Sequence, residues 1–119
     1  MPAEPSPELT DPEDVKLLTL ARANRARARS AEGAAVRDTD GRTYSAAGVD
    51  LPSLQLSALQ VAVAMAVSSG VTGLEAAVVV SDVLAIADAG IGVVRDFAGE
   101  GVPVYRADAS GQVLDCVRT

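Results

Sequence analysis

The sequence predicts an α/β fold in which strands joined through helices lie parallel within one mixed sheet. Three observations predict it: apolar stripes with helical spacing alternate with short apolar runs, turn signals separate them, and the segments follow the order α-β-β-α-β-α-β-β. With 119 residues, of which 49% are hydrophobic, the chain can bury one core of ordinary size. We therefore expect a proline-bearing flexible tail over residues 1–10 and a single domain over residues 11–119.

The first helix is predicted from Asp11, a suitable N-cap, to about Ala28, with Pro12 at the first helical position. Arginines crowd the end of this helix. Two roles are open for these arginines. They could stabilise the helix C-terminus and add solubility, or they could contact an anion or RNA on one face of the helix. The residues concerned are Arg22, Arg25, Arg27 and Arg29.

A hairpin is predicted next, with strands over Gly33–Arg37 and Arg42–Val49. Between them, the run Asp38–Gly41 reads Asp-Thr-Asp-Gly, which is a strong turn signal. A long helix over Leu54–Ser69 should follow and end at Gly70. Because this helix is apolar nearly all round, we expect other elements to cover it on more than one side.

The second half of the chain predicts one more helix and three strands. Leu74–Ser81 contains an unbroken Ala-Ala-Val-Val-Val run, which indicates a buried strand. A helix bearing Gly and Ala is expected over Leu84–Ala98. Two strands, Val102–Arg106 and Gln112–Arg118, should then pair across a turn at Asp108–Gly111.

The composition excludes several classes of function. The chain has no histidine and one cysteine, so most zinc, acid–base and thiol chemistry lacks its usual residues. A net charge of −6 and few aromatic residues argue against binding of nucleic acid. The sole cysteine, Cys116, cannot form an internal disulfide, which is typical of a cytoplasmic protein. No segment reads as a signal peptide or as a membrane span.

In their order and spacing, the segments of this chain resemble those of the cytidine deaminase family. The resemblance covers roughly residues 15–118. The segments that carry it are Gly33–Val36, Thr39–Arg42, Gly48–Asp50, Ser57–Gln60, Ala66–Gly70, Ala77–Val79, Ile86–Gly90, Asp96–Phe97 and Val102–Tyr105. It implies a three-layer α-β-α architecture, with a five-stranded mixed sheet and helices on both faces.

The same resemblance locates a catalytic centre whose residues are missing. In the family, one residue at the start of the central helix and two cysteines at the next helix bind zinc, and a Glu moves protons. The ligand positions are Ser57, Ala87 and Gly90 here, and the Glu position is Leu59. Alanine and glycine have no side-chain donor atom, and leucine cannot carry a proton. We therefore expect no metal, no other cofactor and no zinc-dependent deamination.

Other residues near these positions have alternative interpretations. Asp82 and Asp88 could hold Mg²⁺ or act as acid and base, or they could cap and flank the first turn of the helix after Ser81. Ser57 has no histidine that could act as its base. The run Gly90–Gly92 is too short for a phosphate loop and favours close helix packing. Tyr44 and Tyr105 are expected to pack on the sheet rather than to stack on a base.

Two classes of function follow from the resemblance. The first is a non-catalytic interaction or assembly module in the cytoplasm, forming a homo-oligomer (a dimer or a tetramer), with any other protein partner unspecified. The second is a nucleoside or nucleotide binder, or a hydrolase with an unrecognised site. In the second class, Asp50 stands at the family's ribose-contact position, with Ser53 after it.

Overall fold

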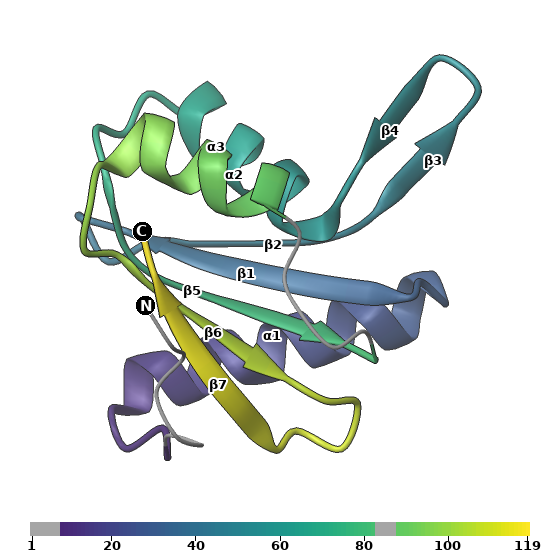
Figure 1. Cartoon of the computed structure of the whole chain (residues 1–119), viewed down its shortest axis with the longest axis horizontal. Helices are drawn as coiled ribbons and strands as arrows, with labels where there is room; N and C mark the ends of the chain where they lie inside the picture. Colours follow the sequence, from purple (N-terminus) through teal and green to yellow (C-terminus); the bar gives the residue numbers. More distant parts are fainter. Residues whose placement is uncertain (1–7, 83–87) are drawn as a thin grey trace.

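A mixed five-stranded sheet forms the middle layer of a three-layer α-β-α fold (Figure 1). The structure, a computed structural model, describes residues 8–82 and 88–119. Helix α1 (Pro12–Ala28) lies on one face of the sheet, and α2 (Ala58–Ser68) and α3 (Asp88–Ala98) lie on the other. The sheet has the order β2-β1-β5-β6-β7. Its strands are β1 (Glu32–Asp38), β2 (Thr43–Ala47), β5 (Leu74–Ser81), β6 (Pro103–Ala107) and β7 (Val113–Arg118). The α/β class and the helices on both faces are confirmed.

The pairing of the strands follows their connections. β5 and β6 are joined through α3 and pair in parallel, as predicted. β1 pairs antiparallel with both β2 and β5, and β6 pairs antiparallel with β7. Because β1 lies between β2 and β5, the connection through α2 crosses over a strand instead of joining neighbours.

Two separate cores explain why the central strands are apolar without alternation. Along β1, Ala34 and Val36 belong to the core under α2 and α3, whereas Ala35 belongs to the core under α1. The same division holds along β5, where Val79 faces the first core and Val78 the second. A strand that is buried on both faces needs apolar residues at successive positions.

A second, two-stranded sheet corrects the predicted boundaries before α2. β3 (Val49–Leu51) and β4 (Leu54–Leu56) pair antiparallel, so Leu54–Leu56 is a strand and not the first turn of a helix. Helix α2 starts at Ala58, and β2 ends at Ala47 instead of continuing to Val49. The helix prediction was wrong there because Leu-Gln-Leu also fits the alternation of a strand, and its partner Val-Asp-Leu lies only two residues upstream.

The remaining boundaries agree closely with the predicted ones. Asp11 caps α1, with its Oδ1 accepting a hydrogen bond from the Glu13 amide at 2.9 Å, and the helix ends at Ala28. The segment 84–87 of the predicted third helix, and residues 1–7 of the predicted tail, lie outside the described residues. Of the other tail residues, Leu9 packs against the core under α1.

A buried carboxylate in the β1–β2 turn predicts how stability depends on pH. Burial alone would raise the pKa of Asp38, but hydrogen bonds from the Tyr44 hydroxyl and the amides of Arg42 and Asp40 outweigh it and lower this pKa below 3.8. The carboxylate therefore stabilises the fold at pH values above the ordinary carboxyl pKa, and this contribution is lost as pH falls through the lowered value.

We expect urea unfolding from neutral pH down to about pH 3 to show a steeper loss of stability in the wild type than in Asp38→Asn. The difference between the two proteins should narrow as the pH falls. A difference that stays constant over this range would contradict the role given to the Asp38 carboxylate.

Candidate functional site

The start of α2 is held by side chains that satisfy its free amide groups. Ser57 is the N-cap: its Oγ accepts a hydrogen bond from the Gln60 amide at 3.1 Å, and the Gln60 side chain accepts one from the Ser57 amide at 2.9 Å. From the start of β1, Glu32 Oε1 accepts a hydrogen bond from the Ala58 amide at 2.6 Å. The positive end of this helix is therefore already occupied by a carboxylate of the same chain.

Leu59 fills the space between the starts of α2 and α3. Its side chain is 2% exposed and belongs to the core under these two helices. Gly90 lies directly against it: a methyl group placed on Gly90 would come within 3.2 Å of Leu59 Cδ2. The structure thus brings together two of the four positions that the sequence assigned to one centre, and their contact is hydrocarbon against backbone. The expectation that the run Gly90–Gly92 favours close helix packing is confirmed at Gly90, whereas a methyl group on Gly92 would meet no atom within 4 Å.

The donor atoms at this centre do not fit a zinc ion. The hydroxyl of Ser57 is used as a helix cap, and neutral Ser is a poor zinc ligand. Leu59 and Gly90 offer no donor atom, and Ala87 lies outside the described residues. Over residues 8–82 and 88–119, no three His, Cys, Asp or Glu side chains gather in a group that could hold a metal.

The capping role of Ser57 gives a prediction of modest size. Ser57→Ala removes the acceptor for the Gln60 amide, so it should lower the free energy of unfolding by about 1 kcal/mol. Ser57→Asp keeps an acceptor at the same place and should cost less. Urea denaturation of the three proteins measures both effects. Equal stability of the wild type and Ser57→Ala would contradict the role of Ser57 as a cap.

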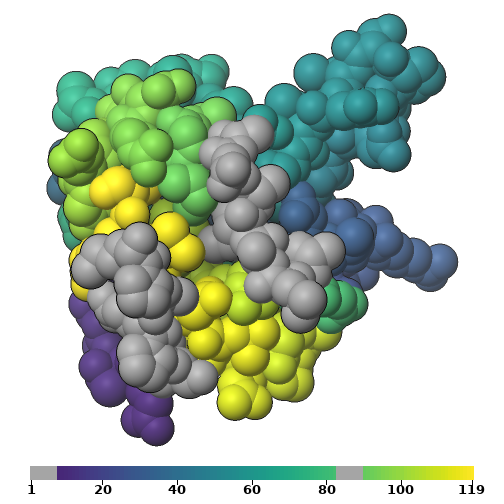
Figure 2. Space-filling view, in the orientation of Figure 1, coloured from purple at the N-terminus to yellow at the C-terminus, as the bar shows by residue number. Residues whose placement is uncertain are grey.

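Asp50 and Ser53, the candidate nucleoside contacts, lie away from this centre on the β3–β4 hairpin. Asp50 pairs in register with Gln55, Ser53 stands in the turn that joins the strands, and both residues are exposed. Figure 2 shows this hairpin protruding from the body of the molecule. A role for these residues in binding stays a prediction, since the structure does not bring them to Leu59.

The arginines at the end of α1 are partly used in contacts within the chain. Arg25 donates to the carbonyl of Ala31 and pairs with Asp82 at 2.6 Å, and Arg27 donates to the Asn24 side chain. Two of the four guanidinium groups are therefore held by local partners, which favours a structural role for this cluster. Asp82 is an ion-pair partner here; the side chain of Asp88 lies outside the described residues.

The aromatic residues and the cysteine are structural as well. Tyr44 packs against the core under α2, and its hydroxyl donates to Asp38 at 2.8 Å. Tyr105 packs against the core under α1. Cys116 is buried, with 2% of its surface exposed. The expectation that both tyrosines pack on the sheet is confirmed.

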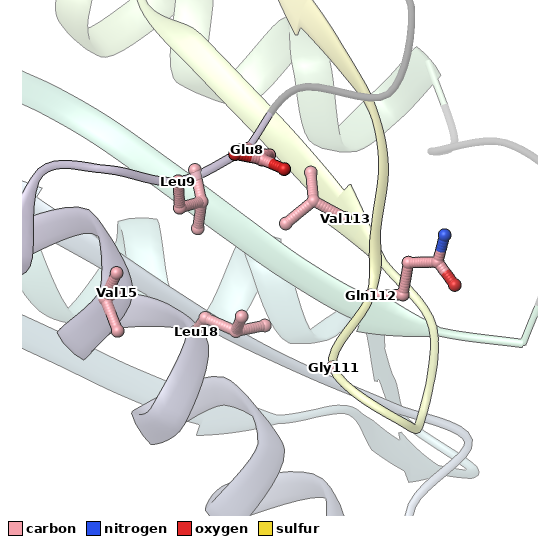
Figure 3. A pocket seen from close by; sticks show the side chains of 7 residues that line it. All are labelled: Glu8, Leu9, Val15, Leu18, Gly111, Gln112 and Val113. Atoms are coloured by element: carbon pink, nitrogen blue, oxygen red, sulfur yellow. The ribbon is translucent and has the colours of Figure 1, made fainter.

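A hollow of about 470 Å³ opens on the opposite side of the sheet, under α1 (Figure 3). Its lining combines apolar side chains with one carboxylate and one amide. The lining residues are Glu8, Leu9, Val15, Leu18, Gly111, Gln112 and Val113. A single carboxylate cannot supply the acid–base pair that hydrolysis usually needs, so this hollow is not a candidate catalytic centre.

Sequence reasoning missed two features of the α2 start. Ser57 and Gln60 have the spacing of a capping box, which would have placed the beginning of the helix at Ala58. The contact of Glu32 with the Ala58 amide joins residues 26 positions apart, and no local pattern marks it.

Comparisons with known proteins agree with this architecture. A family model described as "Cytidine deaminase-like" matches residues 10–111. Among solved structures, a cytidine deaminase from Burkholderia pseudomallei aligns with a TM-score of 0.76 at 21% identity, covering 87% of this chain and 90% of that one. One from Mycobacterium leprae aligns with a TM-score of 0.66 at 20% identity, covering 84% and 90%.

A third similar structure is a mutant cytidine deaminase from Mycobacterium tuberculosis, with a TM-score of 0.65 and 27% identity, covering 75% of this chain and 81% of that one. No curated protein matches the chain. No helix in the described part of the chain has both the length and the apolar character needed to cross a membrane.

Proposed function

The chain belongs to the cytidine deaminase-like family, and from this we propose that it is a non-catalytic member with no zinc, acting as an interaction or assembly module. The observation that carries the proposal is the contact of Leu59 with Gly90. These residues stand where the resemblance places the proton-carrying Glu and one zinc ligand. A packed hydrocarbon contact supplies neither function.

The expected loss of activity is large. A positioned acid or base contributes about 10²–10⁴-fold to such reactions, and Leu59 offers no proton to transfer. Without a metal, nothing described at this centre would lower the pKa of a water molecule.

The assembly half of the proposal rests on the outer face of α2. The helix has no charged residue, and Met65 and Val67, on opposite flanks of this face, are 42% and 49% exposed. The sheet and α3 cover its other sides. An uncharged helix face that is half exposed is typical of a surface that another protein covers. We therefore expect a homo-oligomer, either a dimer or a tetramer.

An assay for uridine released from cytidine tests the catalytic half of the proposal. Purified protein should release no more uridine than a buffer control, with or without added Zn²⁺. Uridine release that follows protein concentration and that changes in Leu59→Met would contradict the proposal. Release that Leu59→Met leaves unchanged would instead indicate a contaminating deaminase.

The binder alternative makes a different prediction for the same preparation. If Asp50 and Ser53 contact a ribose, then millimolar cytidine, uridine or their phosphates should raise the melting temperature, and Asp50→Ala should abolish the rise. We expect no rise with any of these ligands. A rise that Asp50→Ala removes would favour the binder.

A further inference from the structure

The guanidinium group of Arg22 is held in place by the fold without receiving a partner. Three atoms of its side chain, Nη1, Cζ and Cδ, lie 3.0, 3.1 and 3.3 Å from the point where a Cβ on Gly111 would stand. The side chain therefore lies across the turn between β6 and β7, where glycine leaves room for it. Within residues 8–82 and 88–119, Arg22 makes no hydrogen bond or ion pair.

The acidic residue of the same turn does not neutralise this guanidinium. Asp108 Oδ1 accepts hydrogen bonds from the Ser110 hydroxyl at 2.6 Å, the Ser110 amide at 3.0 Å and the Gln112 amide at 3.1 Å. The carboxylate of Asp108 is thus used to close its own turn. No Asp or Glu in the described part of the chain lies within ion-pair distance of Arg22, so the donors of its guanidinium stay available.

This guanidinium stands at one end of the hollow under α1, which Gly111 lines (Figure 3). Val15, Leu18 and Arg22 follow one another on α1 at spacings of three and four residues, so they lie along one flank of the helix. Val15 and Leu18 line the hollow, and Arg22 extends their row toward the turn. From Val15 to Arg22 the helix rises by roughly 10 Å.

The other walls of the hollow are fixed to the core of the protein. Leu9 and Val113 line it, and both belong to the cluster under α1, as does Leu18. Its volume of about 470 Å³ is within the usual range of small-molecule sites, which combine apolar walls with a few polar groups. The hollow therefore offers an apolar surface with a cation at one end.

The charges at the two ends indicate which ligand fits. A guanidinium that is held in place binds a carboxylate through two parallel hydrogen bonds. Glu8 lies at the opposite end in Figure 3, where it would repel a second carboxylate on the same ligand. Glu8 is exposed, and no contact like that of Arg22 with the turn fixes it among the described residues, so ordering it around an amine would cost more conformational entropy.

We propose that this hollow binds a small monocarboxylic acid with an apolar body roughly 10 Å long. Its carboxylate pairs with Arg22, and its body lies along Leu18 and Val15. The inference is independent of the assembly role proposed above, because the hollow lies on the α1 face of the sheet and α2 lies on the other.

Titration of isotope-labelled protein with octanoate, followed through the chemical shifts of the backbone amides, tests this site. The amides of Leu18, Gly111 and Val113 should shift and approach saturation, with a dissociation constant of about 1 mM or lower. Acetate lacks the apolar body, and octanedioate adds a carboxylate toward Glu8. Each of these two acids should bind at least about tenfold more weakly than octanoate.

Three variants separate the head group from the walls. Arg22→Met keeps a long apolar side chain without the charge and should weaken octanoate binding about tenfold or more. Val15→Asp places a carboxylate on the wall at a residue that is 41% exposed, and it should weaken binding as well. Arg95→Met makes the matched change on α3, beyond the sheet, and should leave binding unchanged. The spectrum of each free variant shows whether it is folded.

Each other outcome has a defined meaning. Equal binding of octanoate to Arg22→Met and the wild type overturns the place given to the carboxylate. Octylamine that binds more tightly than octanoate, and does so only while Glu8 is present, overturns the choice of an acid and assigns the hollow to an amine. The absence of saturable shifts at the lining residues overturns the site itself. A monomeric protein, or one that releases uridine, would leave this inference in place.

Discussion

Replacement of Leu59 by Glu, the residue that the family resemblance places there, is expected to lower the free energy of unfolding by at least about 3 kcal/mol. Leu59 is 2% exposed and lies against Gly90 in the core under α2 and α3. A carboxylate at this place would be buried without a partner, which is among the most costly changes in a protein interior. Urea denaturation at neutral pH measures the loss.

The pH dependence of this variant separates charge from shape. Burial would raise the pKa of the new carboxyl group, so the stability deficit of Leu59→Glu should shrink as pH falls and the group takes up a proton. Leu59→Met, which conserves volume, should cost less than about 1.5 kcal/mol at every pH. A Leu59→Glu variant as stable as Leu59→Met would contradict the packed centre described here.

A second large effect is expected at Gly33, where α1 crosses β1. A methyl group on Gly33 would lie 2.1 Å from the Ala21 carbonyl oxygen and 2.9 Å from the Arg25 amide nitrogen. Both are backbone atoms of α1 and cannot swing aside, so the helix itself would have to move. We expect Gly33→Ala to lower the free energy of unfolding by about 3 kcal/mol or more, at the upper end of overpacking effects.

Gly92 provides the matched control for this change. It lies inside α3, has no positive φ, and has no atom within 4 Å of an added methyl group. Gly92→Ala should therefore raise the free energy of unfolding by about 0.5–1 kcal/mol, because Ala favours the helix. Relative to the wild type, the urea midpoint should fall in Gly33→Ala and rise in Gly92→Ala, with the slope of the transition unchanged in both. A loss at Gly33→Ala that is no larger than the gain at Gly92→Ala would contradict the close crossing of α1 and β1.

Local signals in the sequence predicted most of the fold. The Asp-Pro pair at residues 11 and 12 marks the start of α1, and the predicted strand Leu74–Ser81 has the bounds of β5. The turn at Asp38–Gly41 was predicted from the residues Asp-Thr-Asp-Gly. The structure shows why these residues suit it: Gly41 adopts φ +86°, and the Asp38 side chain accepts hydrogen bonds from backbone amides. These features depend on neighbouring residues alone.

The β3–β4 hairpin was not predicted, and its second strand was wrongly assigned to the helix, because each strand has only three residues. A short apolar run next to a long apolar helix fits either structure, and the residues Pro52 and Ser53 leave only a two-residue turn. The hairpin projects from the body because no other helix or strand among the described residues packs against it. No local sequence pattern predicts such an absence.

The candidate site was only partly predictable. The resemblance assigned Ser57, Leu59, Ala87 and Gly90 to one centre, and the structure places Leu59 against Gly90. That contact joins residues 31 positions apart and depends on how α2 and α3 pack. The sequence could say which donor atoms are missing, whereas only the structure shows that a leucine side chain fills the space between the two helices.

Zinc content tests the central claim most directly. The protein is purified without chelators from cells grown with added zinc, dialysed, and measured by mass spectrometry of its metals against protein concentration. The account predicts far less than one zinc per chain, because Ser57 serves as a cap and Leu59 and Gly90 offer no donor atom. One zinc per chain that survives dialysis would contradict it.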